Sequence, residues 1–323
     1  MYDVVALGEL LIDFAAISAD SDGYPTMAAH PGGAPANFLA AVNNFGGKTA
    51  LIGKVGNDTF GNLLVSTLKK SGIDAKGAVI SNEVFTTLAF VTFNEHGDRS
   101  FSFSRKPGAD TQLSFGEIDL SMIDSAKVFH FGTLSLTHDP ARTATYKAVE
   151  YAKNAKKLIS YDPNLRRPLW NTMDEARKQI LWGLSLADVV KISDDEVEFL
   201  FGLAPEQGAK HILNHFGVKL VFVTCGADGC IFANSQSFGH VPGMKGLKVI
   251  DTCGAGDIFG GSAVWQVLQS GKSPENLEAE ELRKIVTFAC TVAGLSTERS
   301  GGISSIPSLL EVNTRQCIMN SSL

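Results

Sequence analysis

Cysteine is sparse in this chain, and its spacing does not indicate a metal site. Five cysteines occur among 323 residues, which is an odd number, and no C-x-x-C pair is present. This pattern argues against a disulfide framework and against a zinc ribbon. The seven histidines form no metal-ligand cluster in the sequence. We therefore expect reduced thiols and a cytoplasmic protein, with histidines that are structural or solvated.

A membrane span, a signal peptide and an excess of positive charge are also missing. No apolar run reaches the length needed to cross a bilayer. The apolar start, residues 4–17, is interrupted by Glu9 and Asp13 and has neither a basic leader nor a small-residue cleavage site. Acidic residues outnumber basic ones by 34 to 28, giving a net charge of -6. Nucleic acid and anionic membranes are therefore not expected as partners.

The apolar pattern that is present predicts an α/β fold. Apolar residues make up 44% of the chain, enough for a sizeable core. Short β-branched runs alternate with longer stretches of helical periodicity, which is typical of a mainly parallel sheet. The predicted strands cover residues 4–7, 51–55, 127–131, 158–161, 189–192 and 220–224. The predicted helices cover residues 36–45, 61–71, 142–155, 173–186, 194–201, 258–270 and 280–296.

One segment departs from this alternation and predicts a hairpin. Residues 87–93 and 99–103 have strand-like composition with several phenylalanines, and the turn-rich residues 94–98 join them. A hairpin inserted into a parallel α/β chain indicates a small projecting sheet that covers a site or meets a second subunit. An ordinary edge hairpin is the alternative.

Small residues near the C-terminal end predict an anion site. In residues 249–262 a short apolar strand leads into Gly254, Ala255, Gly256 and Asp257, and an apolar helix follows. Amides at such a helix start present several donors to a phosphate group in transfer. Asp257 as a simple helix cap is the alternative.

Two other phosphate motifs fit this chain poorly. The glycines after residue 253 imitate a dinucleotide fingerprint, but the third glycine, Gly260, falls one position late and too little chain follows it. Residues 47–49 and 271–273 end like a P-loop, yet the required earlier glycine is Val42 in one case and Gln266 in the other.

Polar residues near the N-terminus are candidates for binding a sugar. Asp13 follows a predicted strand, and Gly32, Gly33 and Asn37 precede or open a predicted helix. A carboxylate accepts hydrogen bonds from hydroxyls, while an amide both donates and accepts. Roles in a turn and a helix cap are the alternative.

Taken together, these segments resemble the ribokinase-like sugar kinase family, and within it the fructokinases. The likeness covers about residues 5–307. The matching stretches are GELLIDF (8–14), PGGAPAN (31–37), GKVGNDTFG (53–61), YDPNLR (161–166), KISDDE (191–196) and DTCGAGD (251–257). The resemblance implies a central, mainly parallel sheet flanked by helices, with a small β-sheet lid. It implies one ribokinase-like domain over residues 1–323, into which the lid, about residues 13–31 and 84–107, is inserted.

The resemblance also implies an activity, ATP-dependent phosphorylation of the terminal hydroxyl of D-fructose to fructose 6-phosphate, with Mg²⁺ bridging the ATP phosphates. Asp257 resembles the catalytic base, and the amides of Gly254, Ala255 and Gly256 resemble the anion hole. Substrate-pocket positions are Asp13, Gly32, Gly33, Asn37, Phe103, Arg105, Asn164 and Arg166. Nucleotide-binding positions are Ser193, Thr224, Gly226, Gly229, Gly254 and Cys290.

Two carboxylates resemble metal-binding positions of the family. Glu196 resembles the glutamate that organises Mg²⁺ through water, although a first-turn carboxylate favoured by the helix dipole is the alternative. Asp251 lies where many relatives hold a potassium ion. Other positions depart from the fructokinase pattern: Cys290 stands where asparagine is common, and Ser104 and Lys106 replace a tyrosine and an asparagine on the lid.

Two rival functions remain open at this stage. A 2-keto-3-deoxygluconate kinase is the nearer one, since Arg105 and Arg166 could hold a substrate carboxylate as a pair. A sugar-sensing regulatory protein on a kinase scaffold is the other, because fold does not fix function. We also expect a homodimer formed through the lid hairpin, because of its apolar faces and the family's habit of pairing lids.

Overall fold

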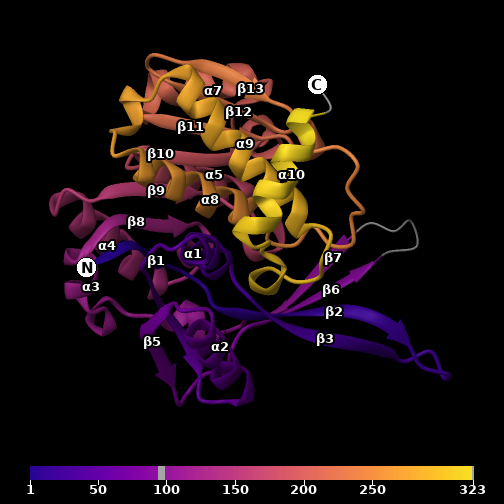
Figure 1. The fold of residues 1–323 in the computed structure, drawn as a ribbon. Helices are drawn as coiled ribbons and strands as arrows, with labels where there is room; N and C mark the ends of the chain where they lie inside the picture. Colours follow the sequence, from indigo (N-terminus) through magenta and orange to yellow (C-terminus); the bar gives the residue numbers. More distant parts are fainter. Residues whose placement is uncertain (94–98, 322–323) are drawn as a thin grey trace.

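A nine-stranded sheet forms the centre of the protein, as Figure 1 shows for the computed structural model, which describes residues 1–93 and 99–321. The strand order is β13-β12-β11-β10-β9-β8-β1-β4-β5. All neighbours from β11 to β5 pair in parallel, and β12 and β13 add an antiparallel edge. The strands are β1 (Tyr2–Leu7), β4 (Thr49–Gly56), β5 (Asp74–Ser81), β8 (Ala126–Gly132), β9 (Leu158–Asp162), β10 (Val189–Ser193), β11 (Leu220–Thr224), β12 (Cys230–Asn234) and β13 (Phe238–Val241).

Helices cover both faces of this sheet, because its strands are apolar on both sides. In β1, Val5 and Leu7 pack into one core, whereas Val4 and Ala6 pack into the other. The first core also takes α3 (Leu120–Asp124), α4 (Ala141–Asn154), α5 (Met173–Leu184), α6 (Asp194–Phe201) and α7 (Pro205–Phe216). The second takes α1 (Ala34–Asn44), α2 (Thr59–Lys70), α8 (Ala255–Ser270) and α9 (Ala279–Ser296), and α10 (Leu309–Ser321) packs against α9.

Short 3₁₀ turns connect several of these elements. They are η1 (Ala109–Gln112), η2 (Phe115–Glu117), η3 (Leu134–Leu136), η4 (Arg167–Leu169), η5 (Gly226–Asp228), η6 (Pro274–Asn276) and η7 (Ile303–Ser305). Among the described residues, no helix has the length and apolar character that a bilayer span requires.

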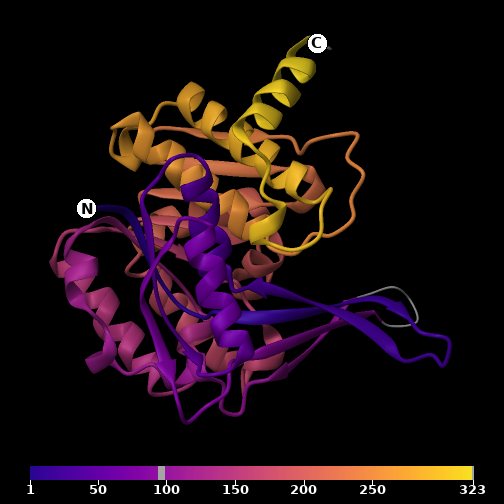
Figure 2. The ribbon, with the colours of Figure 1, turned by 60° about the horizontal axis from the view of Figure 1, so that its bottom comes forward.

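A second, four-stranded sheet extends away from the large one, as Figures 1 and 2 show. Its order is β3-β2-β6-β7, with strands β2 (Leu11–Ala19), β3 (Pro25–Gly32), β6 (Leu88–Phe93) and β7 (Arg99–Ser104). The predicted hairpin is confirmed as the antiparallel pair β6–β7, and the predicted turn at 94–98 lies outside the described residues. Parallel pairing of β2 with β6 joins this hairpin to a second one, β2–β3.

One group of aromatic side chains joins the small sheet to helix α2. Phe14 of β2 stacks on Phe90 of β6, with ring centroids 5.3 Å apart, and meets Phe60 of α2 edge-on at 5.4 Å. Helix α2 therefore covers part of the apolar surface on which the predicted dimer contact rests. Farther along the β2–β3 hairpin, Ile17 of β2 and Tyr24 in the turn before β3 are exposed.

Candidate active site

A cavity of about 730 Å³ lies where the two sheets meet. Leu11, Asp13 and Phe103 line it from the small sheet. Residues at the carboxyl ends of β9 and β10 and at the starts of α1 and α8 line it from the large sheet. Strand β1 lies between β8 and β4, so the chain order reverses there. Ligands of open α/β sheets bind outside the strand ends at such a reversal.

Asp257 lies at the centre of the large-sheet side of the cavity. It is in the first turn of α8, which begins after Gly254 with its φ of 74°. The carboxylate is 7% exposed; its Oδ2 accepts a hydrogen bond from Asn37 Nδ2 at 3.0 Å, and its Oδ1 accepts one from Asn164 Nδ2 at 2.9 Å. Burial raises the pKa of Asp257, while the Asn37 contact and nearby Lys191 oppose that rise. The cavity is thus lined by a buried carboxylate that accepts hydrogen bonds from two asparagine side chains.

Asn37 carries a polar atom without a partner. Its Oδ1 is buried and, within residues 1–93 and 99–321, receives no hydrogen bond. The side chain enters the cavity from α1, whose start depends on Gly33: φ there is 115°, and a Cβ would lie 2.4 Å from the Glu9 carbonyl oxygen. A buried acceptor without a donor is unfavourable.

Asp13 faces Asp257 from the small-sheet side. Burial raises the pKa of Asp13 to about 6, and the neighbouring Arg166 guanidinium acts in the opposite direction. Gly32 does not line the cavity, but a Cβ on it would lie 2.3 Å from Asp13 Oδ2. Glycine at this position leaves room for the Asp13 carboxylate.

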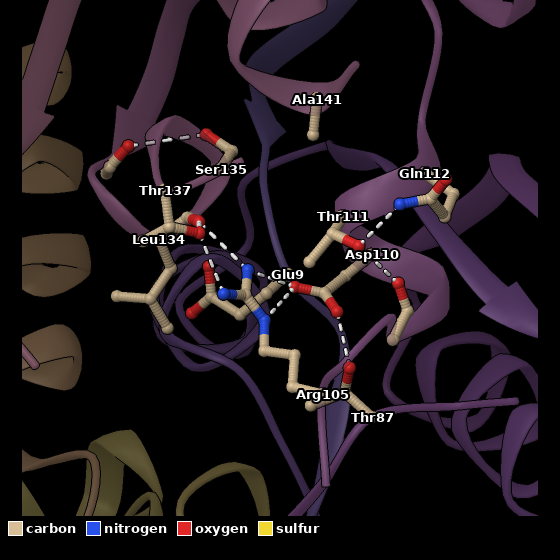
Figure 3. A network of polar contacts seen from close by, with 12 residues as sticks. Glu9, Thr87, Arg105, Asp110, Thr111, Gln112, Leu134, Ser135, Thr137 and Ala141 are labelled. Carbon is tan, nitrogen blue, oxygen red and sulfur yellow. Dashed lines mark hydrogen bonds and ion pairs between the residues drawn. The ribbon is translucent and has the colours of Figure 1, made fainter. Parts of the chain in front are cut away.

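The structure places Arg105 differently from the sequence prediction, as Figure 3 shows. The residue follows β7 and is 4% exposed, but it does not line the cavity. Its Nε and Nη2 donate to Asp110 Oδ2 at 2.8 and 2.6 Å. The guanidinium also donates to Thr137 Oγ1 at 2.8 Å and to the Leu134 carbonyl oxygen at 2.9 Å. These contacts connect the end of β7 to the wall of the cavity, because Leu134 lines the cavity.

Asp110 also holds the other strand of the hairpin. Its second carboxylate oxygen accepts a hydrogen bond from the hydroxyl of Thr87, the residue that precedes β6. The Thr87 carbonyl oxygen in turn accepts the amide of Ile12 in β2, at 3.1 Å. We call Thr87, Arg105 and Asp110 the lid anchor.

Glu196 faces the cavity from the start of α6. Its Oε2 accepts the Ser193 amide at 2.9 Å in a capping box, and its Oε1 accepts the Leu165 amide at 2.6 Å. Each carboxylate oxygen has a second lone pair. The structure therefore contains the helix-start role that was the alternative for Glu196, and the carboxylate keeps acceptor capacity for water.

Most of the predicted nucleotide positions lie at or just after the carboxyl ends of β10 and β11. Ser193 lines the cavity, and Thr224 is its register partner on β11. Gly226 and Gly229 form the turn between β11 and β12, and Cys290 lies on α9. None of the last four lines the cavity. The turn joins β11 and β12 in an antiparallel hairpin, and contact of these residues with a nucleotide stays a prediction.

Asp251 closes a loop next to the anion-hole residues. Its Oδ1 accepts the Cys253 amide at 2.9 Å, and its Oδ2 accepts the Gly301 amide at 3.0 Å. These contacts tie the segment before Gly254 to the turn at residues 300–302.

Lys191, its partner Asp162 and Glu9 received no role from the sequence, and of these Lys191 and Glu9 line the cavity. Lys191 Nζ lies 3.1 Å from Asp162 Oδ2. Glu9, after β1, is 3% exposed, and its Oε1 accepts the Ala34 amide at 2.8 Å. Both carboxylates and the lysine interrupt or directly follow apolar strands, and that position was the available signal in the sequence.

Comparison with known proteins decides the family. The model of the pfkB family carbohydrate kinases matches residues 1–309. The chain belongs to this family. It is therefore a carbohydrate kinase on a ribokinase-like fold, which uses ATP and an alcohol group as acceptor, as the sequence predicts.

Relatives of this pfkB-family kinase include several fructokinases. Fructokinase-2 of Solanum lycopersicum is 41% identical over 317 residues, which cover 96% of this chain and 95% of the relative. Among solved structures, a fructokinase with bound ATP from Xylella fastidiosa is 29% identical, with a TM-score of 0.90 and full coverage of both chains. A fructokinase from Vibrio cholerae O395 in a fructose, ADP and calcium ion bound form is 31% identical, with a TM-score of 0.85, over 97% of this chain and 98% of that one.

Proposed function

We propose that this kinase is a fructokinase, which transfers the γ-phosphoryl group of ATP to the terminal hydroxyl of D-fructose and releases fructose 6-phosphate and ADP. The observation that carries the proposal is the position of Asp257, a buried carboxylate at a helix start, held by two amides in the cavity between the sheets. The fructokinases among the relatives, at about 41% identity, support the choice of sugar.

In the proposed reaction, the sugar hydroxyl oxygen attacks the γ-phosphorus, and the bond from that phosphorus to the β,γ-bridging oxygen breaks. The hydroxyl proton moves to Asp257, and ADP leaves with the electron pair of the broken bond. The amides of Gly254, Ala255 and Gly256 stabilise the charge on the transferred group. Positioning and electrostatics supply most of the catalysis in phosphoryl transfer.

The sugar lies, in this proposal, between Asp13 and Asn37. Asp13 accepts hydrogen bonds from hydroxyls on the small-sheet side, and Asn37 lines the cavity on the other side. Phe103 covers the sugar from β7, and Arg166 adds positive charge near both Asp13 and Asp257. Asn164 acts through Asp257, whose Oδ1 it holds.

Mg²⁺ fits the acidic side of the same cavity. Asp195 and Glu196 line it, and oxygen donors are the ligands that this ion prefers. Glu196 already accepts hydrogen bonds from two backbone amides, so it would hold the ion through water. When bound, Mg²⁺ neutralises charge on the ATP phosphates. The nucleotide itself would extend past Ser193 towards Thr224, Gly226, Gly229 and Cys290.

The lid anchor disfavours the rival kinase of 2-keto-3-deoxygluconate. That reading needs the Arg105 guanidinium for a substrate carboxylate, but the guanidinium is bound to Asp110, Thr137 and Leu134 outside the cavity lining. A neutral sugar needs no such partner. In this proposal, Arg105 holds the lid through these contacts and does not contact the sugar.

We also propose a cytoplasmic homodimer that pairs through the small sheet. The projection of that sheet and the exposed Ile17 of β2 and Tyr24 of the β2–β3 turn support it. Sedimentation velocity at micromolar concentration should give twice the 34.4 kDa chain mass. A monomer, or a dimer that persists after Ile17→Lys, would contradict pairing through the sheet. The potassium site at Asp251 stays a prediction, to be checked by assays with and without KCl.

The test of the proposed function is ADP release by the purified protein with Mg-ATP and a panel of sugars at equal concentration. The panel contains fructose, 2-keto-3-deoxygluconate, ribose, glucose and an aminoimidazole riboside. Fructose should give the highest kcat/KM, and NMR of the product should place the phosphate on the 6-hydroxyl. Preference for another sugar would overturn the substrate, and no turnover with any sugar would favour the sugar-sensing reading.

A further inference from the structure

The cavity contains an ion pair that the mechanism above does not use. Lys191 and Asp162 lie on the neighbouring parallel strands β10 and β9, where Val190 is the register partner of Tyr161. Lys191 follows Val190 on β10, and Asp162 follows Tyr161 on β9, so the two residues are neighbours across the strands. Their side chains meet with Nζ 3.1 Å from Oδ2, and these side chains are 12% and 5% exposed. Lys191 lines the cavity.

The Lys191 ammonium lies beside the proposed anion hole. Gly256 is the second residue of α8, and a Cβ on it would lie 2.9 Å from Lys191 Nζ. The amides at the start of α8 and the ammonium therefore border the same part of the cavity. Backbone amides at a helix start and a fixed cation both favour an anion.

Asp162 connects this lysine to Asp257. The Asp162 Oδ1 accepts the Asn164 amide at 3.1 Å, and the Asn164 side chain donates to Asp257 Oδ1 at 2.9 Å. Asn164 adopts a φ of 48°, in the left-handed region. Non-glycine residues in that region cost free energy, and the surroundings must hold them there. One connected set of contacts thus positions the ammonium and the proposed base together.

The ammonium has spare donors and stays charged. It carries three N–H bonds, and Asp162 is its one side-chain partner among the described residues. Its pKa is raised: burial lowers it, but the carboxylates of Asp162, Glu196 and Asp257 outweigh burial. Lys191 therefore carries a fixed positive charge at neutral pH and is not a base.

Stability alone is a poor reason for this pair. Taking two charges out of water costs about as much as their attraction returns, so an apolar pair of similar volume is often as stable. The lid anchor differs, because Arg105 is bound on several sides and does not reach the cavity. Lys191 lines the cavity beside the start of α8, where the proposed function places the γ-phosphate.

We propose that Lys191 is a catalytic residue: its ammonium binds the phosphoryl group in transfer next to the α8 amides, and Asp162 positions it. This inference rests on the proposed function and deepens it. Lys191 neither gains nor loses a proton; the hydroxyl proton still goes to Asp257, and the electron pair of the broken bond leaves with ADP. The ammonium stabilises the charge on the non-bridging oxygens of the transferred group.

The experiment compares wild type with Lys191→Met/Asp162→Asn, which removes both charges and leaves no unpaired buried carboxylate. Lys191→Arg and Asp162→Asn are the matched single variants, since both retain a positive charge. The equilibrium readout is calorimetric binding of ADP with fructose, measured without and with fluoroaluminate, which mimics the phosphoryl group in transfer. The kinetic readouts are kcat and KM for fructose, and the melting temperature reports folding.

We expect fluoroaluminate to tighten ADP binding in wild type. In the double variant, the gain in ADP affinity that fluoroaluminate gives should be about 10²-fold smaller. ADP binding without fluoroaluminate should change less than about threefold, and kcat should fall by about 10²- to 10³-fold. Lys191→Arg should retain most of the gain, whereas Asp162→Asn, which keeps the ammonium but loses the ion pair that positions it, should retain only part of the gain. A purely structural role would instead weaken ADP and fructose binding together and lower the melting temperature.

The inference is overturned if the double variant keeps the full fluoroaluminate gain, or if it loses ADP binding in the same proportion. A wild type that turns over another sugar but not fructose overturns the proposed substrate alone, and the Lys191 comparison is then made with that sugar. A wild type that shows neither turnover nor a fluoroaluminate gain overturns both.

Discussion

The two sides of the cavity are built in different ways. On the large-sheet side, Asp162, Lys191 and Asp257 stand at strand ends or a helix start inside the main core, and their side chains are held by one another and by Asn164. On the small-sheet side, Asp13 and Phe103 stand on strands that leave that core, and the lid anchor attaches the sheet. In the proposed function, the large-sheet side therefore carries the chemistry and the small-sheet side selects the sugar.

The largest expected effect concerns the chemical side alone. Asp257→Asn keeps the size of the side chain but removes the proton acceptor, so kcat should fall by about 10²- to 10⁴-fold. The fructose dissociation constant should change only a few-fold, and the melting temperature should stay within a few degrees. Steady-state assays and calorimetry check both values; a wild-type kcat would contradict the assignment of Asp257 as base.

The second prediction concerns the attachment of the lid. Arg105→Met leaves the Asp110 carboxylate buried without its cation, which should lower the free energy of unfolding by about 3–5 kcal/mol. Urea denaturation measures this value. The matched double variant Arg105→Met/Asp110→Asn should recover part of the stability, while KM for fructose stays raised because Phe103 is no longer held.

A direct sugar contact by Arg105 would give the opposite pattern. Arg105→Met would then raise KM without loss of stability, and adding Asp110→Asn would restore nothing. That result would return Arg105 to the substrate pocket.

The third prediction concerns Glu9, which lies where the two sides join. Burial raises the pKa of Glu9 to about 7, against 4.5 for the ordinary group. The folded state therefore holds the proton more tightly than the unfolded state, and this contribution to stability is present below about pH 4.5 and lost as the pH rises to about 7. Its size is up to about 3 kcal/mol.

Glu9→Gln should remove this part of the pH dependence, so the variant should gain stability relative to wild type at pH 8. Denaturation at pH 5 and pH 8 measures the difference between the two proteins. If the difference in unfolding free energy between Glu9→Gln and wild type is the same at pH 5 and pH 8, Glu9 does not titrate in this range.

The smallest expected effect is the pH dependence of activity. Burial raises the pKa of Asp257 and takes that of Asp13 to about 6, and both groups act as carboxylates in the proposal. The groups that face them are Lys191, Arg166, Asp162, Glu196 and Asp251. As the pH falls, protonation should reduce kcat/KM with a midpoint well above the usual aspartate range. A flat profile down to pH 4.5 would contradict this.

The sequence predicted the large-sheet side better than the small-sheet side. Strand ends and helix starts are local patterns, so Asp257 and the glycines before it could be recognised as a candidate phosphate site. Lys191 begins the matching stretch KISDDE, but it received no role because it lies inside an apolar strand. Its partner Asp162 is distant in sequence and adjacent only in the folded sheet.

The small sheet was harder to predict because its strands break local rules. Strand β3 contains Pro25 and Pro31, which are tolerated because β3 is an edge strand, and edges follow only from the topology. Arg105 was assigned to the substrate because it follows a lid strand. Sequence spacing alone did not show that Asp110, five residues later, would bind the guanidinium.

The most direct test of the division between the two sides is a side-by-side measurement of kcat and the fructose dissociation constant in Asp13→Asn and Asp257→Asn. Loss of a charged hydrogen-bond acceptor typically costs about 1.5–3 kcal/mol. Asp13→Asn should therefore weaken fructose binding by about 10- to 100-fold, whereas Asp257→Asn should bind fructose almost normally and lose turnover. Equal loss of binding in both variants, or turnover retained in Asp257→Asn, would contradict the account.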